Sequence, residues 1–187
     1  MTMKKGFHVW CWALALVMAI SLCDTAQAKI RAPRHLHGQQ EQGQQNPGAQ
    51  QQQPKEIKTA YFNLSLEKGW RLLKPVQTQN GAVSVLLGAP GNKGAIAINV
   101  MKANLNAEEL AKNMRANMEK DKVSLEALEE KDGIQEFGFT RGKATGRAWI
   151  GANGKEAAAV TIFGDQEAGK EVMKKLQPKD PALFPRF

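Results

Sequence analysis

Four short turn motifs that contain glycine limit what the last two thirds of this chain can fold into. They are Asn80-Gly81, Pro90-Gly91-Asn92, Asp132-Gly133 and Asn153-Gly154. Glycine adopts the positive φ that tight hairpin turns require. A chain that reverses direction at such short connections favours antiparallel strands.

Between the turns, apolar and polar residues alternate, which is the pattern of a half-buried strand. Three early strands are predicted from the apolar sets Phe62/Leu64/Leu66, Val83/Val85/Leu87 and Ile96/Ile98/Val100. Three more follow over 134–140, 144–150 and 157–163, and their short connections predict a meander. We interpret 122–129 as a further strand, although its pattern also fits a helix.

Two segments have a helical period instead. Asn106 and Glu109 have the spacing of a capping box, and they predict a helix over about 107–120. Its apolar stripe, Leu110, Met114 and Met118, is interpreted as core rather than as a soft-metal site.

A second helix is expected after the N-cap Asp165 and ends before Pro178. It presents Val172, Met173 and Leu176 inward. The order of elements predicts an α+β domain, in which helices pack on an antiparallel sheet.

The N-terminus has the three parts of a secretory signal peptide. Lys4 and Lys5 precede an apolar run of 16 residues, and Ala26-Gln27-Ala28 follows it. The run is shorter than the roughly 20 residues of a spanning helix. We predict a signal peptide over 1–28, cleavage after Ala28, and an exported, periplasmic protein. An uncleaved signal that anchors the chain is the alternative.

Cys23 offers a second route to the membrane, because it lies where a bacterial lipobox places its acylated cysteine. The bulky Leu22 before it departs from the small residue of such boxes. Without lipidation, Cys23 is discarded with the signal peptide.

Residues 29–57 are predicted to be a disordered linker. Residues 38–54 hold nine glutamines together with glycine and proline, and they carry almost no apolar side chain to bury. The α+β domain is expected over 58–177, and a C-terminal tail over 178–187 includes Phe184 and Phe187, which are candidates to pack back on the domain.

The predicted domain contains no histidine and no cysteine, since the last of each are His37 and Cys23. This excludes Ser/His and Cys/His catalysis and the usual zinc sites. The sequence predicts no metal and no cofactor. A carboxylate-dependent hydrolase is a remote alternative, because the adjacent pairs Glu108/Glu109 and Glu129/Glu130 do not suggest two acids that converge across a cleft.

The whole chain has a net charge of +8, and residues 58–187 carry 20 basic and 15 acidic residues. This mixed, modest excess suits an anionic membrane surface or an acidic partner. It lacks the clustered basic and aromatic residues of a nucleic-acid-binding protein.

One predicted hairpin suggests a binding surface. It carries Arg141 and Lys143 at its turn, and Arg147 and Trp149 follow on one face of the next strand. The opposite face is made of small residues, which suit close helix packing. Arg and Trp on the less covered face would form an interaction hot spot. The favoured interpretation is nevertheless that Trp149 is core and Arg147 extends past it to solvent.

The segment 62–70, an amphipathic strand followed by Gly69-Trp70, resembles the opening of the PsbP/DcrB-like domains. Glu108-Glu109-Leu110-Ala111 is similar to the helix start of those proteins, and the match covers about 59–177. The resemblance implies an α/β/α sandwich with no shared catalytic residues. It also implies a function in binding, as in the exported DcrB-type envelope proteins.

The expected function is therefore a non-enzymatic accessory or adaptor module of the cell envelope that binds a protein partner. A periplasmic protein that binds a small molecule or lipid is the alternative.

Overall fold

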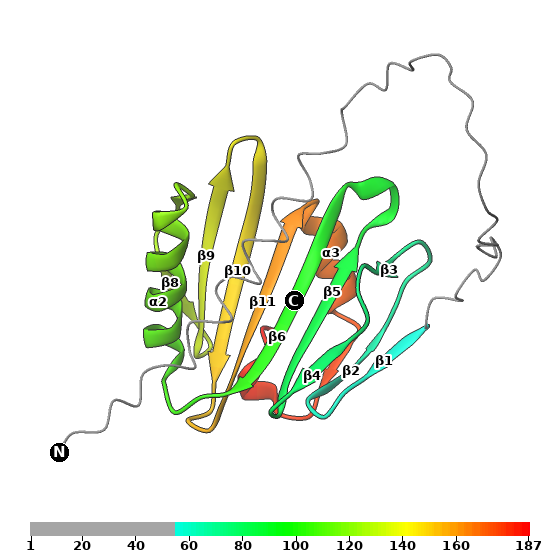
Figure 1. Ribbon diagram of the computed structural model, residues 1–187, viewed down its shortest axis with the longest axis horizontal. Coiled ribbons are helices and arrows are strands. Elements are labelled where there is room, and N and C mark those ends of the chain that lie inside the picture. The colour runs from blue at the N-terminus through cyan, green and yellow to red at the C-terminus, as the bar shows by residue number, and fades with distance from the viewer. Residues whose placement is uncertain (1–54) are drawn as a thin grey trace, which may run out of the picture. The chain divides into compact units, whose positions relative to one another are not determined.

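The computed structural model describes residues 55–187 (Figure 1). The predicted signal peptide, its cleavage after Ala28, Cys23 and nearly all of the linker lie outside the described residues. The described residues belong to one compact unit. No helix within residues 55–187 is long and apolar enough to cross a membrane.

The main sheet has nine strands, and every pair is antiparallel. Its order is β3-β5-β6-β11-β10-β9-β7, while β4 also pairs with β5 and β8 also pairs with β9. The strands are β3 (Arg71–Leu72), β4 (Gln77–Gln79), β5 (Ala82–Gly88), β6 (Gly94–Lys102), β7 (Ser124–Leu125), β8 (Glu129–Lys131), β9 (Ile134–Arg141), β10 (Ala144–Ala152) and β11 (Glu156–Gly164).

The predicted turns connect these strands. Asn80 and Gly81 both have positive φ between β4 and β5, and Asp132 and Gly133 do the same between β8 and β9. Positive φ at both central residues defines the type I′ hairpin turn, whose twist matches that of the strands. The meander β9–β10–β11 is confirmed, and β11 lies between β10 and β6.

The two helices pack on opposite faces of the sheet. Helix α2 (Ala107–Lys120) contacts β9 and β10, and helix α3 (Gln166–Met173) contacts β11 and β6. Arg115 of α2 lies over the Phe137 ring, while Gly169 of α3 packs on Ile162. Phe137 pairs with Ala148, and Ile162 pairs with Arg147. Because Arg147 and Ala148 are consecutive in β10, their side chains point to opposite faces of the sheet, and so do the two contacts.

The α3 face of the sheet holds the main core. Apolar residues of β5, β6 and β11 on this face are fully buried, among them Val85, Ile98 and Val160. A small sheet of β1 (Glu56–Lys58), β2 (Phe62–Ser65) and β12 (Leu176–Pro178) is also part of this core through Ile57, Phe62 and Leu64. The short 3-10 helix η2 (Pro181–Leu183) adds Leu183, and η1 (Pro90–Asn92) lies in the connection between β5 and β6.

The structure confirms an α+β fold on an antiparallel sheet, and it confirms the capping box of α2 and the Asp165 cap of α3. Four details of the sequence interpretation are wrong. The domain begins before residue 58, because Glu56–Lys58 forms β1 and Ile57 is part of the core. Helix α3 ends at Met173, because Leu176–Pro178 pairs with β2 as β12. Residues 122–129 form only β7 and the first residue of β8. The buried side of α2 is Ala107, Ala111 and Met118, whereas Leu110 and Met114 are half-buried.

Candidate functional site

The four predicted binding residues lie in two separate places. Arg141 and Lys143 lie at the β9–β10 turn, where Arg141 pairs with Ala144. Arg147 and Trp149 lie farther along β10, on the face that α3 covers. The small residues Gly146 and Ala148 are buried on the α2 side, as predicted. The structure therefore does not bring the four residues together in one site.

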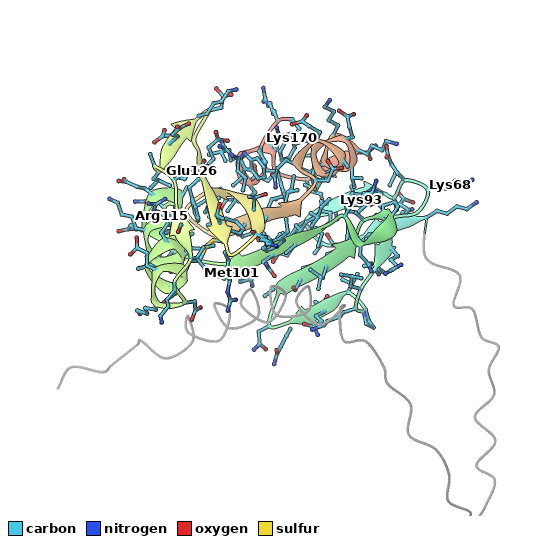
Figure 2. The ribbon with its side chains drawn as sticks, turned by 90° about the horizontal axis from the view of Figure 1, so that it is seen from above. Lys68, Lys93, Met101, Arg115, Glu126 and Lys170 are labelled. Atoms are coloured by element: carbon cyan, nitrogen blue, oxygen red, sulfur yellow. The ribbon has the colours of Figure 1, made fainter. Side chains whose placement is uncertain are left out.

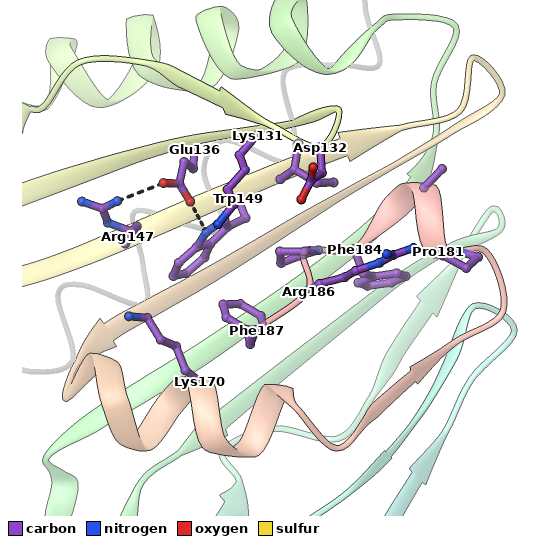
Figure 3. Close-up of a pocket in the computed structure, with 13 residues that line it drawn as sticks. Lys131, Asp132, Glu136, Arg147, Trp149, Lys170, Pro181, Phe184, Arg186 and Phe187 are labelled. Carbon is purple, nitrogen blue, oxygen red and sulfur yellow. Dashed lines mark hydrogen bonds and ion pairs between the residues drawn. The ribbon is translucent and has the colours of Figure 1, made fainter.

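Arg147 and Trp149 line an open-sided cavity of about 690 Å³, which we call the tryptophan cavity (Figure 3). Its walls come from the β8–β9 hairpin, β10, α3 and the C-terminal segment. The lining residues are Lys131, Asp132, Ile134, Glu136, Arg147, Trp149, Lys170, Pro181, Ala182, Phe184, Pro185, Arg186 and Phe187.

Trp149 forms the floor of the cavity and is only 5% exposed. Its indole Nε1 donates a hydrogen bond of 2.6 Å to Glu136 Oε2, and the Phe187 ring lies edge-on against it at 5.0 Å. The expectation of a weakly covered tryptophan is wrong, because the C-terminal segment folds back over this face. The favoured interpretation of Trp149 as a core residue is confirmed.

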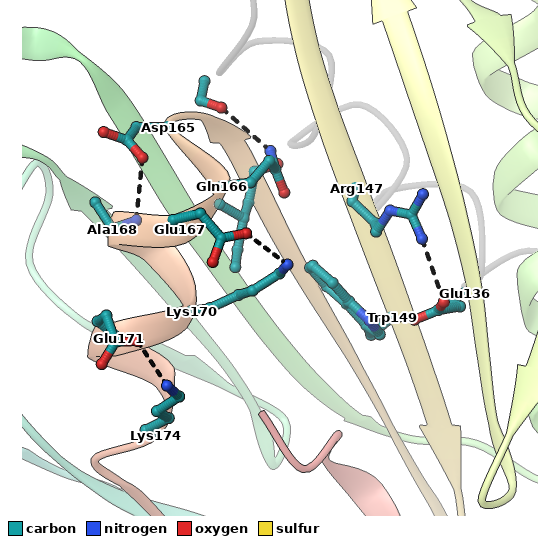
Figure 4. A network of polar contacts seen from close by, with 12 residues as sticks. Glu136, Arg147, Trp149, Asp165, Gln166, Glu167, Ala168, Lys170, Glu171 and Lys174 are labelled. Carbon is teal, nitrogen blue, oxygen red and sulfur yellow. Dashed lines mark hydrogen bonds and ion pairs between the residues drawn. The ribbon is translucent and has the colours of Figure 1, made fainter.

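Arg147 is held between two carboxylates. Its guanidinium lies 3.2 Å from Glu136, as Figure 4 shows, and 3.0 Å from Glu126. Glu126 reaches this position because residue 138 is glycine, and a Cβ there would overlap its carboxylate. Glu136 thus binds Arg147 and Trp149 at once. This shared carboxylate fixes the orientation of both side chains.

The remaining charged residues of the cavity are less constrained. Lys170 reaches from α3 toward β10 and pairs with Glu167 on its own helix at 2.9 Å (Figure 4). Lys131, Asp132 and Arg186 form no ion pair within residues 55–187. The cavity thus has an ordered polar wall beside Trp149 and free charges of both signs at other positions.

The element η2 closes one side of the cavity, and Asp180 begins it. The Asp180 carboxylate accepts hydrogen bonds from the Asn153 side chain at 2.7 Å and from the Ala182 N–H at 2.9 Å. These bonds favour the ionised form and lower the pKa of Asp180 below its ordinary value. Gly151 lets η2 approach β10 closely, because a Cβ there would lie 2.6 Å from the carbonyl oxygen of Leu183.

This arrangement is suited to binding. Aromatic rings, a fixed arginine and free charges around an open cavity can recognise a ligand or a protein segment. Glu126 and Glu136 are both engaged by Arg147. No group of three or more His, Cys, Asp or Glu side chains within residues 55–187 is placed to hold a metal ion.

Sequence reasoning missed Glu136, Lys170 and Phe187 as parts of this site. One signal was present for Glu136. The two-residue turn Gly142-Lys143 pairs Arg141 with Ala144, and this register places Glu136 directly opposite Trp149. No local signal in the sequence places α3 or Phe187 beside β10.

Comparisons with known proteins do not identify a family for this chain. No protein-family model matches the chain, and no curated protein matches it. A crystal structure from Bacteroides thetaiotaomicron VPI-5482, determined at 1.50 Å resolution, superposes with a TM-score of 0.40 at 18% sequence identity. The superposition covers 69% of this chain and 50% of that one, so the chain spans about half the length of this structure.

Proposed function

We propose that this protein is an exported, non-enzymatic accessory module of the cell envelope that binds a protein partner through the tryptophan cavity. The observation that carries the proposal is the cavity itself, an open space of about 690 Å³ whose floor is Trp149 and whose wall is the Glu126–Arg147–Glu136 network. Arginine is among the residues enriched at the energetic centres of protein interfaces, and the half-buried Arg147 lines this cavity.

The composition of the cavity favours a protein segment over a lipid. Lipid-like molecules bind in enclosed pockets lined mainly by apolar groups. Here six of the lining side chains are charged: Lys131, Asp132, Glu136, Arg147, Lys170 and Arg186. A small molecule with both apolar and polar groups is the second candidate, and the aromatic cluster of Trp149, Phe184 and Phe187 favours it.

The hydrolase alternative has little support. General acid–base chemistry by two carboxylates requires them to face a substrate from two sides. Glu126 and Glu136 instead bind one guanidinium, and one oxygen of Glu136 accepts from the Trp149 indole. We therefore propose no catalytic role for them.

We further propose a PsbP-like α/β/α sandwich of the DcrB type for the domain. The placement of α2 and α3 on opposite faces of the sheet supports it. Export rests on the N-terminal sequence pattern alone. The mature chain is expected to start at Lys29, with cleavage after Ala28.

Site-specific crosslinking in the envelope tests the protein-binding function. A photoreactive amino acid replaces Lys131 at the cavity in one strain and Lys155, in the β10–β11 turn, in another. We expect a protein adduct from position 131 that is absent from position 155. Arg147→Ala should reduce its yield, since the wall of the cavity loses its central cation.

Two outcomes would contradict the proposal. Equal adducts from both positions would show that contact is not centred on the cavity. If position 131 gives no protein adduct while the purified chain retains a small molecule, detected by native mass spectrometry, the second candidate replaces the first.

A further inference from the structure

One end of the main sheet collects basic residues that lie far apart in the sequence. A single row of paired residues crosses the sheet near this end: Arg71, Gly88, Ala95, Phe163, Gly146, Phe139 and Leu125. The turns beyond the row are the β5–β6 connection and the β9–β10 hairpin, and the chain enters β3 and β7 there. Figure 2 shows this end from above, with Lys68 and Lys93 labelled.

We call the cations in and beyond that row the basic rim: Lys68, Arg71, Lys93, Lys122, Arg141 and Lys143. Arg141 is half-buried and the others are exposed. None of them forms an ion pair within residues 55–187. Arg71 donates a hydrogen bond to the Asn92 side chain, and Nη1 of Arg141 has no hydrogen-bond partner.

The acidic residues at this end form no ion pair with the rim cations and are fewer than they are. Glu67 pairs with Lys175, 2.7 Å away, and Asp165 accepts from Ala168 N as the cap of α3. Asp121 ends α2 as its C-cap. The rim therefore presents an excess of positive charge to solvent across the width of the sheet.

An exposed apolar side chain accompanies these charges. Leu73 is 43% exposed, and it is the exposed large apolar residue among those the structure describes. It lies two residues after Arg71, in a backbone hydrogen bond with Leu86, and its side chain rests on Gly88 of the rim row.

We propose that the basic rim docks on the surface of an anionic phospholipid bilayer. Flexible lysines without partners suit mobile headgroups, and each cation near such a surface favours binding. A bilayer is also broad enough to meet charges spread over β3, β7 and both hairpins, whereas a compact ligand would need them to converge. Leu73 then enters the interfacial region, where apolar groups leave water.

Vesicle binding tests this surface independently of the tryptophan cavity. The full-length chain is expressed with its own N-terminus, and intact mass defines the purified form. Sedimentation with phosphatidylglycerol/phosphatidylcholine vesicles measures affinity. We expect the Lys93→Ala/Arg141→Ala/Lys143→Ala variant to bind about 100-fold more weakly, at about five-fold for each cation removed. Added salt should weaken binding of the unmodified chain.

A matched variant controls for net charge. Lys102→Ala/Lys155→Ala/Lys179→Ala removes the same charge at the opposite end of the domain, where these residues are exposed. It should retain most of the affinity, and circular dichroism should show that both variants fold. A second variant, Leu73→Ser, should weaken binding several-fold at unchanged charge.

Each of the following results would overturn the proposal. One is that the unmodified chain binds vesicles of pure phosphatidylcholine equally well, or binds neither kind of vesicle. Another is that both triple variants lose the same affinity. A third is that the rim variant keeps full affinity, which would assign binding to residues outside the rim. If rim substitutions abolish a protein crosslink but leave vesicle binding unchanged, the rim is a protein interface.

Discussion

The β9–β10 hairpin and the middle of strand β10 carry similar side chains in opposite electrostatic states. Near its start, Arg141 and Lys143 extend from a hairpin without carboxylate partners. Farther along, Arg147 lies between Glu126 and Glu136, and Glu136 also binds Trp149. The same sheet therefore holds a closed polar network at the tryptophan cavity and an open set of cations at the basic rim.

This contrast distinguishes charges that the fold holds in ion pairs from charges that are free to bind a partner. Glu136, whose side chain is only 20% exposed, binds two donors, because a buried charge without partners loses its hydration without compensation. The ordered wall of the cavity is thus partly a condition of folding, and only Lys131, Asp132 and Arg186 remain free there. Exposed rim cations keep their hydration, so they can stay unpaired until a partner arrives.

The largest expected difference between the two regions is in stability. Trp149→Ala removes a buried ring and leaves Glu136 without its indole donor, so we expect a loss of about 3–5 kcal/mol. Lys143→Ala, at the exposed rim, should change the free energy of unfolding by less than about 0.5 kcal/mol. Urea denaturation of both variants measures this. Similar small changes in the free energy of unfolding of both variants would show that Trp149 is not a packed core residue.

A smaller difference is expected for two glycines of β10 and its hairpin. In Gly151→Ala the new methyl meets Leu183 O at 2.6 Å and Ile134 Cδ1 at 2.7 Å, which costs about 1–3 kcal/mol. Gly142 has a φ of 60° and open space around it, so alanine there costs only backbone strain of about 1 kcal/mol.

Hydrogen exchange distinguishes these two glycine variants. The Leu183 amide, which bonds to Asp180 O, should lose protection in Gly151→Ala and keep it in Gly142→Ala. Unchanged protection in both would mean that η2 does not depend on the close approach at Gly151.

The smallest expected effect is a pH dependence at η2. The folded-state pKa of Asp180 is below its ordinary value of 3.8, so its ionised form stabilises the folded protein. This contribution is complete above the unfolded pKa and disappears as the pH falls through the folded one. Unfolding measured across that acidic range should lose less stability in Asp180→Asn than in the unmodified chain. Identical slopes would exclude the Asp180 contribution.

Local structure was predictable from the sequence because short-range chemistry determines it. The glycine turns set the hairpins, and the two-residue turn at Gly142-Lys143 sets the register of β9 and β10. Asn106 and Glu109 fixed the start of α2, since their side chains bond to backbone groups within one turn. These features placed the meander, the first helix and the small-residue face of β10 correctly.

Tertiary structure decided which charges are paired and which aromatic residues are covered. Helix α3 ends at Met173 because β2, more than one hundred residues earlier, provides a partner strand for Leu176–Pro178. Trp149 is buried because Phe187 returns to it, and Glu126 reaches Arg147 because Gly138 leaves space. Such contacts join segments that are far apart in the sequence, and no local sequence pattern predicts them. Their energy depends on the burial that only the complete fold provides.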